Sequence, residues 1–294
     1  MKLSTEDFNS LSQAALGAAA GAARFIRSRA NEEIEVMRKE GGNTEASQVF
    51  TEVDLASERL ILEALQPTTE KYELGILTEE AEDDSSRHES DFFWCIDPID
   101  GTLPFIKGEP GYSVVIALVS RDGISQLGVV HDVVADIAYH AIRDRGAYRD
   151  GKPVSLSENV PATHLSWFMD RSMLKHPRFE EWGERLEDAA RNRGLEGVRK
   201  IDHAGAALNA SWLASSMPAV YFKCPKKEDG GGSVWDFAAS SCFCEVLRLP
   251  VSDMSGKSLN LNPQGSTFMN RTGVLYATTE EWRDAVQSIY AELS

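Results

Sequence analysis

The sequence is poor in basic residues, in cysteine and in long uncharged runs, and each shortage argues against a class of protein. Its 294 residues include 30 Lys and Arg against 46 Asp and Glu, which gives a formal net charge of −16. The basic residues do not gather into a cluster. Proteins that bind nucleic acid usually present such a basic patch. We therefore expect no nucleic-acid polymer among the partners of this protein.

The four cysteines fit neither the spacing of a zinc site nor a disulfide framework. They are Cys95, Cys224, Cys242 and Cys244. A composition of this kind suits a reducing compartment, so we expect a cytoplasmic protein.

Neither of the two weakly charged stretches predicts a membrane or export segment. The longest uncharged stretch, residues 204–222, contains Asn209 and Pro218. It is more typical of a buried helix followed by a strand than of a membrane span. The Ala- and Gly-rich run at residues 14–23 follows two acidic residues, whereas a signal peptide needs a basic start. We expect a helix of the mature protein there and no association with membranes.

The most informative stretch is residues 92–102, in which an apolar run is followed by polar residues. The apolar run predicts a strand buried on both faces. Asp97 and Asp100 come directly after it, and Gly101 and Thr102 follow. Two carboxylates held at the end of a strand suit a hard cation such as Mg²⁺. A hydroxyl and N–H groups just beyond them suit a phosphate.

An ordinary turn and a different class of phosphatase compete with a cation site in this stretch. Asp and Gly close many strands in turns, and this interpretation stays open until further acids are found. Phosphatases with an aspartyl nucleophile have the pattern D-x-D-G-T-L, which the residues from Asp100 onward imitate. That pattern needs an aspartate at position 98, where this chain has Pro98. Proline cannot attack phosphorus, so the aspartyl-nucleophile interpretation fails.

Three further acids each lie where a strand ends or a helix starts. Asp54 follows a short extended segment and leads into a helical pattern, where capping the helix is the simpler role. Glu79 follows a short strand predicted at residues 74–77, at the head of an acidic run that otherwise predicts a solvated face. Asp236 begins a helix predicted over residues 236–247. The glycine-rich loop before it lacks the spacing of a P-loop.

The predicted elements differ between the two halves of the chain. A hydrophobic fraction of 42% is ample for a large core. In residues 1–155, helices are followed by strands joined by tight turns, which predicts helices on a mostly antiparallel sheet. In residues 156–294, strands and helices alternate, which predicts a second set of α/β layers. We expect Thr278, with Glu281, to cap the last helix.

At four places the sequence resembles the inositol monophosphatase superfamily of Mg²⁺-dependent, lithium-sensitive phosphatases. The matching segments are residues 50–54, 76–80, 94–102 and 235–239, in the family's order. The piece Asp-Pro-Ile-Asp-Gly-Thr within the third segment is highly specific. The resemblance implies an α+β or α/β fold, a layered α-β-α-β-α sandwich of the inositol monophosphatase and fructose-1,6-bisphosphatase type. It also implies a homodimer.

The resemblance implies a set of metal ligands for two or three Mg²⁺ ions per active site. One ion would lie on Glu79, Asp97 and the carbonyl of Ile99. A second ion would lie on Asp97, Asp100 and Asp236.

The same resemblance implies the catalytic residues. A third, weaker ion would lie near Glu79 and reach Asp54 through water. The N–H groups of Gly101 and Thr102 would hold the phosphate. Thr102, with Glu79 or Asp54, would orient a water and take its proton. That water would attack phosphorus in line with the leaving oxygen.

Substrate contacts are implied at two places. The family has a Gly-Ser/Thr-Ala-Ala piece that corresponds to residues 204–207, of which Gly205 and Ala206 would touch the substrate. Ala204 replaces the first glycine here. Inositol-specific members carry an acid several residues before the last metal aspartate, and Asp229 is its candidate counterpart.

Nucleotidase members of the superfamily place a basic residue in this same region. Lys223, Lys226 and Lys227 are the candidates, and solubility is the commoner role of surface lysines. Thr78 is a further departure, since many members have Gly or Ser at that position.

These observations predict an enzyme that hydrolyses inositol monophosphate or a similar small polyol phosphate. A 3′(2′),5′-bisphosphate nucleotidase is the close alternative, and histidinol phosphate and sugar bisphosphates stay open as substrates. An alternative of another kind is a non-catalytic binding or dimerisation module with the same fold. Such a module would be expected to lose a metal-binding acid, and none is lost here.

Overall fold

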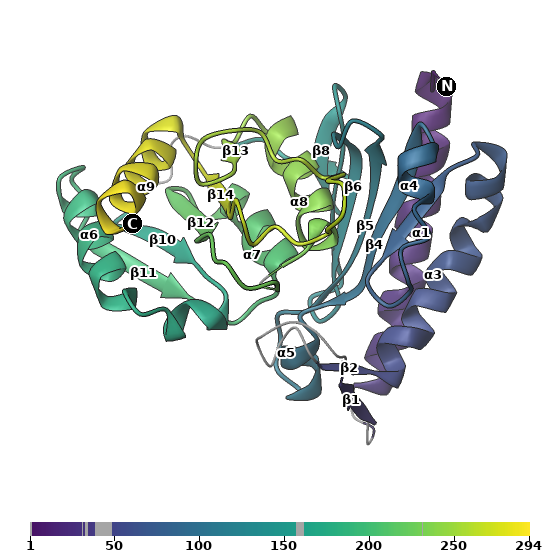
Figure 1. The fold of residues 1–294 in the computed structure, drawn as a ribbon, viewed down its shortest axis with the longest axis horizontal. Coiled ribbons are helices and arrows are strands. Elements are labelled where there is room, and N and C mark those ends of the chain that lie inside the picture. The colour runs from purple at the N-terminus through teal and green to yellow at the C-terminus, as the bar shows by residue number, and fades with distance from the viewer. Residues whose placement is uncertain (1, 31, 33–34, 39–48, 157–161, 231) are drawn as a thin grey trace.

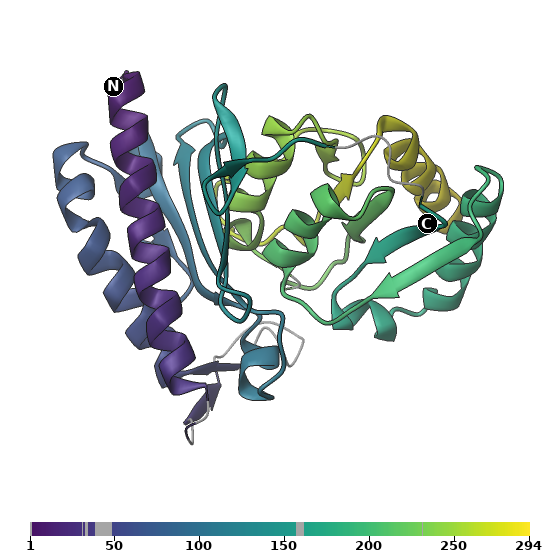
Figure 2. The ribbon, with the colours of Figure 1, turned by 180° about the vertical axis from the view of Figure 1, so that it is seen from behind.

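The computed structural model describes residues 2–30, 32, 35–38, 49–156, 162–230 and 232–294. Two larger sheets stand apart, with helices outside each and between them (Figure 1). Across the molecule the layers are α1 with α3, a seven-stranded sheet, α7 with α8, a five-stranded sheet, and α6 with α9 (Figures 1 and 2). The predicted α-β-α-β-α sandwich is confirmed.

The seven-stranded sheet has the strand order β3-β4-β5-β6-β7-β8-β9, and only its β3–β4 pair is parallel. The Asp-Gly pairs at residues 122–123 and 150–151 lie in the turns that join β5 to β6 and β8 to β9. The strands are β3 (Gly75–Thr78), β4 (Phe92–Asp100), β5 (Ser113–Ser120), β6 (Ser125–Asp132), β7 (Ile137–Ile142), β8 (Gly146–Arg149) and β9 (Lys152–Pro153).

Two long helices, α1 (Thr5–Arg29) and α3 (Glu52–Lys71), cover the outer face of this sheet. A capping box between Ser4 and Asp7 starts α1. Most of the buried residues of α1 are alanines, and these small side chains let the helix lie close to α3 and to the sheet. Smaller elements beside this part are β1 (Val36–Arg38), β2 (Val49–Thr51), α4 (Ser86–Glu89) and α5 (Thr102–Ile106).

The five-stranded sheet has the order β11-β10-β12-β14-β13, with β10 parallel to both of its neighbours and β14 antiparallel to both of its own. Helices α6 and α9 cover its outer face. The elements are β10 (His164–Phe168), α6 (Phe179–Arg191), β11 (Gly197–Ile201), β12 (Ala219–Lys223), β13 (Val251–Ser252), β14 (Val274–Ala277) and α9 (Glu280–Leu293), with 3₁₀ turns at η1 (Arg171–Lys175) and η2 (Trp212–Ser215).

The cap of α9 differs from the prediction by one residue. The hydroxyl of Thr279 accepts the N–H of Trp282 at 3.3 Å, so Thr279 is the cap. Thr278 instead exchanges hydrogen bonds with the backbone of Ala219 on β12, through its hydroxyl. The prediction that Thr278 caps α9 was wrong, because the hydroxyl of Thr278 bonds to β12 instead.

Helices α7 (Ala206–Ser211) and α8 (Val234–Val246) fill the space between the sheets. A Cβ atom on Gly128 of β6 would lie 2.3 Å from the carbonyl oxygen of Ala239 on α8, so glycine is needed for this close packing. The seven-stranded sheet lies within the first half of the chain and the five-stranded sheet within the second. The division into units at residues 1–155 and 156–294 stays a prediction.

Among the described residues the buried apolar side chains form three clusters, one outside each large sheet and one between the two sheets. The largest cluster lies around α7 and α8 and takes side chains from both halves of the chain. Within the described part of the chain, none of the helices combines the length and the apolar character that crossing a membrane would require.

Candidate active site

Asp97 and Asp100 lie at the end of β4, where its pairing with β5 is irregular. Asp97 pairs with Val115 and Asp100 with Ser113, so three steps along β4 face two along β5. Such a bulge brings side chains three residues apart to the same side of the sheet, whereas a regular strand would point them to opposite sides. Pro98, which has no N–H to donate, lies inside the bulge.

Asp236 joins these two residues from the first turn of α8. Oxygen atoms of Asp97, Asp100 and Asp236 lie within 4.8 Å of one another. Asp236 also accepts the N–H of Ser233 at 2.5 Å, within the capping box that starts the helix. The sequence thus brings three carboxylates together from two distant segments. Oxygen donors at this spacing suit hard divalent cations.

The hydrogen bonds and charges that the chain offers the three carboxylates do not offset their burial. Burial raises the pKa of Asp97 well above its ordinary value, and neighbouring acids raise it further. Burial raises the pKa of Asp100 to about 8, against hydrogen bonds from α7. Burial raises the pKa of Asp236 to about 6, against the pull of Lys223. A divalent cation would favour the ionised forms, so the donor set fits Mg²⁺.

Asp54 caps α3 and contacts Thr102 at the same time. One carboxylate oxygen accepts the N–H and the hydroxyl of Thr51, at 2.8 and 2.5 Å. The other oxygen lies 3.2 Å from the hydroxyl oxygen of Thr102, which is also 3.1 Å from the carbonyl oxygen of Ile99. Burial raises the pKa of Asp54 to about 6, although the bonds from Thr51 oppose the shift.

Glu79 follows β3 directly, and its charge acts on the aspartates. Its N–H donates to the carbonyl of Ile96 on β4 at 3.2 Å. In addition to burial, the negative charge of Glu79 raises the pKa of Asp54, Asp97 and Asp236. Glu79 is half-buried, whereas Glu82 and Asp84 further along the acidic run are exposed. Glu79, directly after β3, therefore does not belong to the solvent-exposed face that the sequence predicts for the acidic run.

The backbone of residues 205–207 lies against Asp100. The N–H groups of Ala206 and Ala207 donate to its two carboxylate oxygens at 3.0 and 2.9 Å. A Cβ atom on Gly205 would lie 2.5 Å from the same carboxylate, so a larger residue does not fit. The substrate contacts predicted for Gly205 and Ala206 stay predictions.

Gly101 and Thr102 begin α5. Gly101 has φ +94°, and a Cβ atom there would lie 2.8 Å from the carbonyl oxygen of Gly111. The position therefore requires glycine for both its conformation and its surroundings. The phosphate contacts predicted for Gly101 and Thr102 stay predictions.

The loop before α8 holds the other predicted substrate residues. Lys227 and Asp229 are exposed, and Lys226 is half-buried. The N–H of Lys226 donates to the carbonyl of Asn270 at 2.7 Å, which ties the loop to the segment before β14. The substrate contacts of Lys226, Lys227 and Asp229 stay predictions.

Lys223, at the end of β12, has a charge that reaches the aspartates. Its Nζ lies 2.5 Å from Asp170 and 5.3 Å from the ring centre of Phe237. Burial alone would lower the pKa of Lys223, but Asp170 and Asp236 raise it. Asp170 also accepts the hydroxyl of Tyr221 at 2.9 Å. Sequence patterns do not single out Asp170, although it follows β10 as the other acids follow their strands.

Comparisons with known proteins agree with this arrangement. The model of a family described as "Inositol monophosphatase family" matches residues 7–292. An inositol-1-monophosphatase of Bacillus subtilis is 28% identical over 235 residues, which cover 78% of this chain and 78% of that protein. A 3′(2′),5′-bisphosphate nucleotidase of Salmonella typhimurium is 27% identical over 232 residues, which cover 75% and 82%. The solved structure of an IMPase of Thermotoga maritima has a TM-score of 0.73 and covers 95% of both chains, and its identity of 22% supports the fold.

Proposed function

Because the chain belongs to the inositol monophosphatase family, we propose that it is a Mg²⁺-dependent phosphatase of small phosphomonoesters. The observation that supports this most directly is the cluster of Asp97, Asp100 and Asp236. The contact of Asp54 with Thr102 adds a carboxylate and a hydroxyl beside that cluster. Cations and a group that accepts a proton are the two requirements of phosphate hydrolysis by activated water.

The ligands of the proposed site come from three segments of the chain. Asp97, Asp100 and Asp236 would share two ions, with Glu79 and the carbonyl of Ile99 completing one of them. A third ion near Glu79 would reach Asp54 through water. Ions bound there would lower the pKa of a water molecule and stabilise the leaving oxygen.

Thr102 and Asp54 would handle the proton of the attacking water. The hydroxyl of Thr102 can accept a hydrogen bond from that water while it donates to Asp54 or to the Ile99 carbonyl. Asp54, with a pKa raised to about 6, is close to the value at which a base works well near neutral pH. Water adds to phosphorus, the bond to the substrate oxygen breaks, and an alcohol and inorganic phosphate leave.

We take inositol monophosphate or a similar small polyol phosphate as the leading substrate. Hydrolysis of a 3′(2′),5′-bisphosphate nucleotide is the second candidate, because Lys223 places a partly buried ammonium group near the aspartates. Its pairing with Asp170 already neutralises much of that charge, so the monophosphate stays first. Asp229, Gly205 and Ala206 would contact the alcohol part of the substrate.

Three further properties belong to the same proposal. We expect the active protein to be a homodimer, to be inhibited by Li⁺ and to work in the cytoplasm. Gel filtration, a Li⁺ titration of turnover and fractionation of cells test these expectations one by one.

The central experiment measures phosphate release over a panel of phosphomonoesters. The panel holds inositol 1-phosphate, adenosine 3′,5′-bisphosphate, histidinol phosphate and a sugar bisphosphate. We expect the wild type to release no phosphate after chelation and to regain its activity when Mg²⁺ is added. The Asp97→Asn variant should release almost no phosphate with or without Mg²⁺. Full activity in metal-free buffer would contradict the proposal. A folded protein that releases phosphate from none of the panel would favour the non-catalytic module.

A further inference from the structure

Glu58 is a buried acid one helical turn after Asp54 on α3, and it has no part in the chemistry described above. The residue is 8% exposed. One of its carboxylate oxygens accepts two hydrogen bonds, from the hydroxyl of Thr78 at 2.5 Å and from the N–H of Glu80 at 3.0 Å. These donors come immediately before and after Glu79 in the sequence.

The chain around Glu79 is therefore held at three successive residues, through the side chain of Thr78 and the N–H groups of Glu79 and Glu80. Glu58 binds the residues on both sides, and the N–H of Glu79 itself donates to the carbonyl of Ile96 on β4. A side chain whose backbone is held in this way can take only a few directions. The direction taken here lets the charge of Glu79 act on Asp54 and Asp97.

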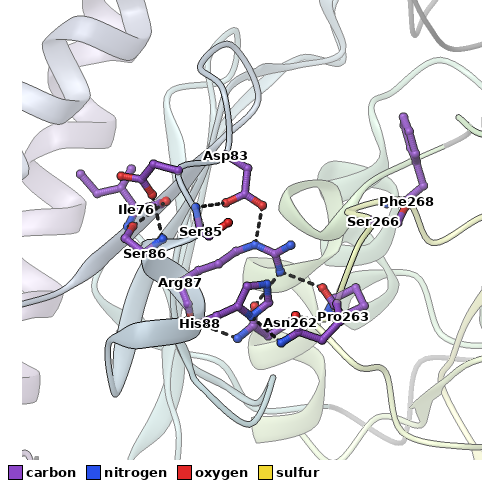
Figure 3. A network of polar contacts seen from close by, with 12 residues as sticks. Ile76, Asp83, Ser85, Ser86, Arg87, His88, Asn262, Pro263, Ser266 and Phe268 are labelled. Carbon is purple, nitrogen blue, oxygen red and sulfur yellow. Dashed lines mark hydrogen bonds and ion pairs between the residues drawn. The ribbon is translucent and has the colours of Figure 1, made fainter.

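The far end of the same acidic turn is anchored as well. Arg87 is 2% exposed, and its guanidinium donates to Asp83 at 2.8 Å, to the side-chain oxygen of Asn262 at 2.7 Å and to the carbonyl of Pro263 at 3.0 Å (Figure 3). Asn262 returns a bond to the carbonyl of Arg87 at 3.1 Å. The turn over residues 79–83 is thus tied to α3 at its start and to the second half of the chain at its end.

A purely structural role for Glu58 is the alternative. A buried hydroxyl and a partly buried N–H need an acceptor whatever the turn does. The placement of Glu58 indicates a second role in addition to this structural one. Its two hydrogen-bond donors, Thr78 and Glu80, lie on either side of Glu79, whose charge acts on the aspartates. The same helix also carries Asp54, which contacts Thr102, so α3 sets the positions of both sides of the candidate site.

We propose that Glu58 is a positioning residue, which holds Glu79 in the orientation that the cation site needs. The inference rests on the function proposed above. It also gives Thr78 a defined part, since its hydroxyl supplies one of the two bonds and serine would keep it. Loss of a group that orients a metal ligand typically weakens metal binding about 10- to 100-fold.

The test compares variants by their affinity for Mn²⁺ alone, measured by electron paramagnetic resonance without substrate. Glu58→Ala removes both bonds and Thr78→Val removes one at nearly constant volume. Glu58→Gln and Thr78→Ser keep an acceptor and a donor in place. Glu63→Ala is the matched control, because it removes an exposed acid from the same helix. Thermal unfolding of the metal-free proteins is recorded beside each titration.

We expect Mn²⁺ affinity to fall about 10- to 100-fold in Glu58→Ala and in the same direction, by less, in Thr78→Val. Glu58→Gln, Thr78→Ser and Glu63→Ala should bind Mn²⁺ as the wild type does. If Glu58→Ala does not fold, Thr78→Val decides the matter alone. Wild-type affinity in the folded variants that lost a bond, or an equal loss in Glu63→Ala, overturns the inference. A wild type that binds Mn²⁺ but hydrolyses no phosphomonoester overturns the proposed function instead, and the affinities still test Glu58.

Discussion

The hydroxyl oxygen of Thr102 lies 3.2 Å from a carboxylate oxygen of Asp54, although 48 residues separate them in the sequence. The two side chains meet because Asp54 lies in the first turn of α3 and Thr102 is the first residue of α5. The same hydroxyl oxygen lies 3.1 Å from the carbonyl oxygen of Ile99, so two acceptors fix its position. A hydroxyl held in this way can align a water molecule for attack and pass its proton to a neighbouring carboxylate.

The first prediction concerns Thr102. Thr102→Val keeps the volume and removes the hydroxyl, and we expect kcat to fall about 10²-fold, at the low end of the range for a lost proton-transfer group. KM should change little, since the substrate phosphate would still meet the backbone. Thr102→Ser restores the hydroxyl and should restore most of kcat. Steady-state kinetics at saturating Mg²⁺ measure both constants. A rate for Thr102→Val equal to that of Thr102→Ser would rule out this role for the hydroxyl.

The acids of the candidate site stand out in the sequence because each lies near a strand end or a helix start, but only the resemblance of four segments to a known family joins them into one predicted site. A strand end fixes the direction of the next side chain, so Glu79, Asp97 and Asp100 stand out from the other acidic residues. The bulge after Asp97 could not be foreseen from this pattern. It depends on how β5 pairs with β4, and it places the two aspartates on one side.

Features that depend on distant partners could not be read from local patterns. Asp170, just after β10, and Lys223, at the end of the neighbouring strand β12, form an ion pair, and their separation in sequence hides the contact. Strand β11 is absent from the predicted elements, because it pairs only with β10 at the edge of its sheet and two of its five residues, Arg199 and Lys200, are charged. By sequence Thr278 is the better cap, because Glu281 lies three residues after it, and only the contact of Thr278 with β12 leaves the cap to Thr279.

The second prediction separates catalysis from folding at Glu79. Glu79→Gln keeps the shape of the side chain and removes its charge, so the protein should fold and unfold thermally as the wild type does. The rate at a fixed Mg²⁺ concentration should fall at least about 10²-fold, because a cation ligand that also polarises water is lost. Glu82→Gln is the control, since Glu82 is exposed in the same acidic run. Wild-type turnover in Glu79→Gln, or a failure to fold, would contradict the assigned role.

The third prediction concerns the stability of the metal-free protein as pH changes. In the folded chain the pKa of Asp100 is raised to about 8 and that of Asp236 to about 6, from an ordinary value of 3.8. Below about pH 4 both states hold these protons, and no stability is lost. As pH rises through 4 to 8, the unfolded chain releases protons that the folded chain keeps, so the free energy of unfolding falls.

Thermal unfolding in the presence of a chelator measures this dependence between about pH 5 and pH 9. We expect the midpoint to fall as pH rises, and Mg²⁺ to restore most of the loss at about pH 8, because bound cations stabilise the ionised carboxylates. The acidic surface also repels itself as pH rises, so the matched control is Asp97→Asn, which removes one buried carboxyl that can titrate and leaves the surface unchanged. The curve for Asp97→Asn should be flatter than that of the wild type. Parallel curves would show that the buried aspartates do not cause the dependence.

The last prediction concerns the choice of substrate. Lys226 and Lys227 lie on the loop before Asp236, and a bisphosphate nucleotide would need positive charge for its second phosphate. The structure leaves Lys227 exposed, so the monophosphate proposal predicts that Lys226→Ala/Lys227→Ala has wild-type kcat/KM for inositol 1-phosphate. Lys257→Ala, another exposed lysine, is the control for a general loss of surface charge.

The measurement compares inositol 1-phosphate with adenosine 3′,5′-bisphosphate for each protein. Loss of a charge-assisted contact costs about 1.5–3 kcal/mol, which corresponds to a fall of about 10- to 150-fold in kcat/KM. A fall of that size for the bisphosphate alone would place the nucleotidase function first. Lys223→Met tests the ammonium group beside Asp170 in the same way. A fall in kcat/KM for the bisphosphate alone would indicate that the second phosphate binds at the end of β12. Equal effects on both substrates, or none, leave the loop lysines as solvated surface and keep the polyol monophosphate ahead.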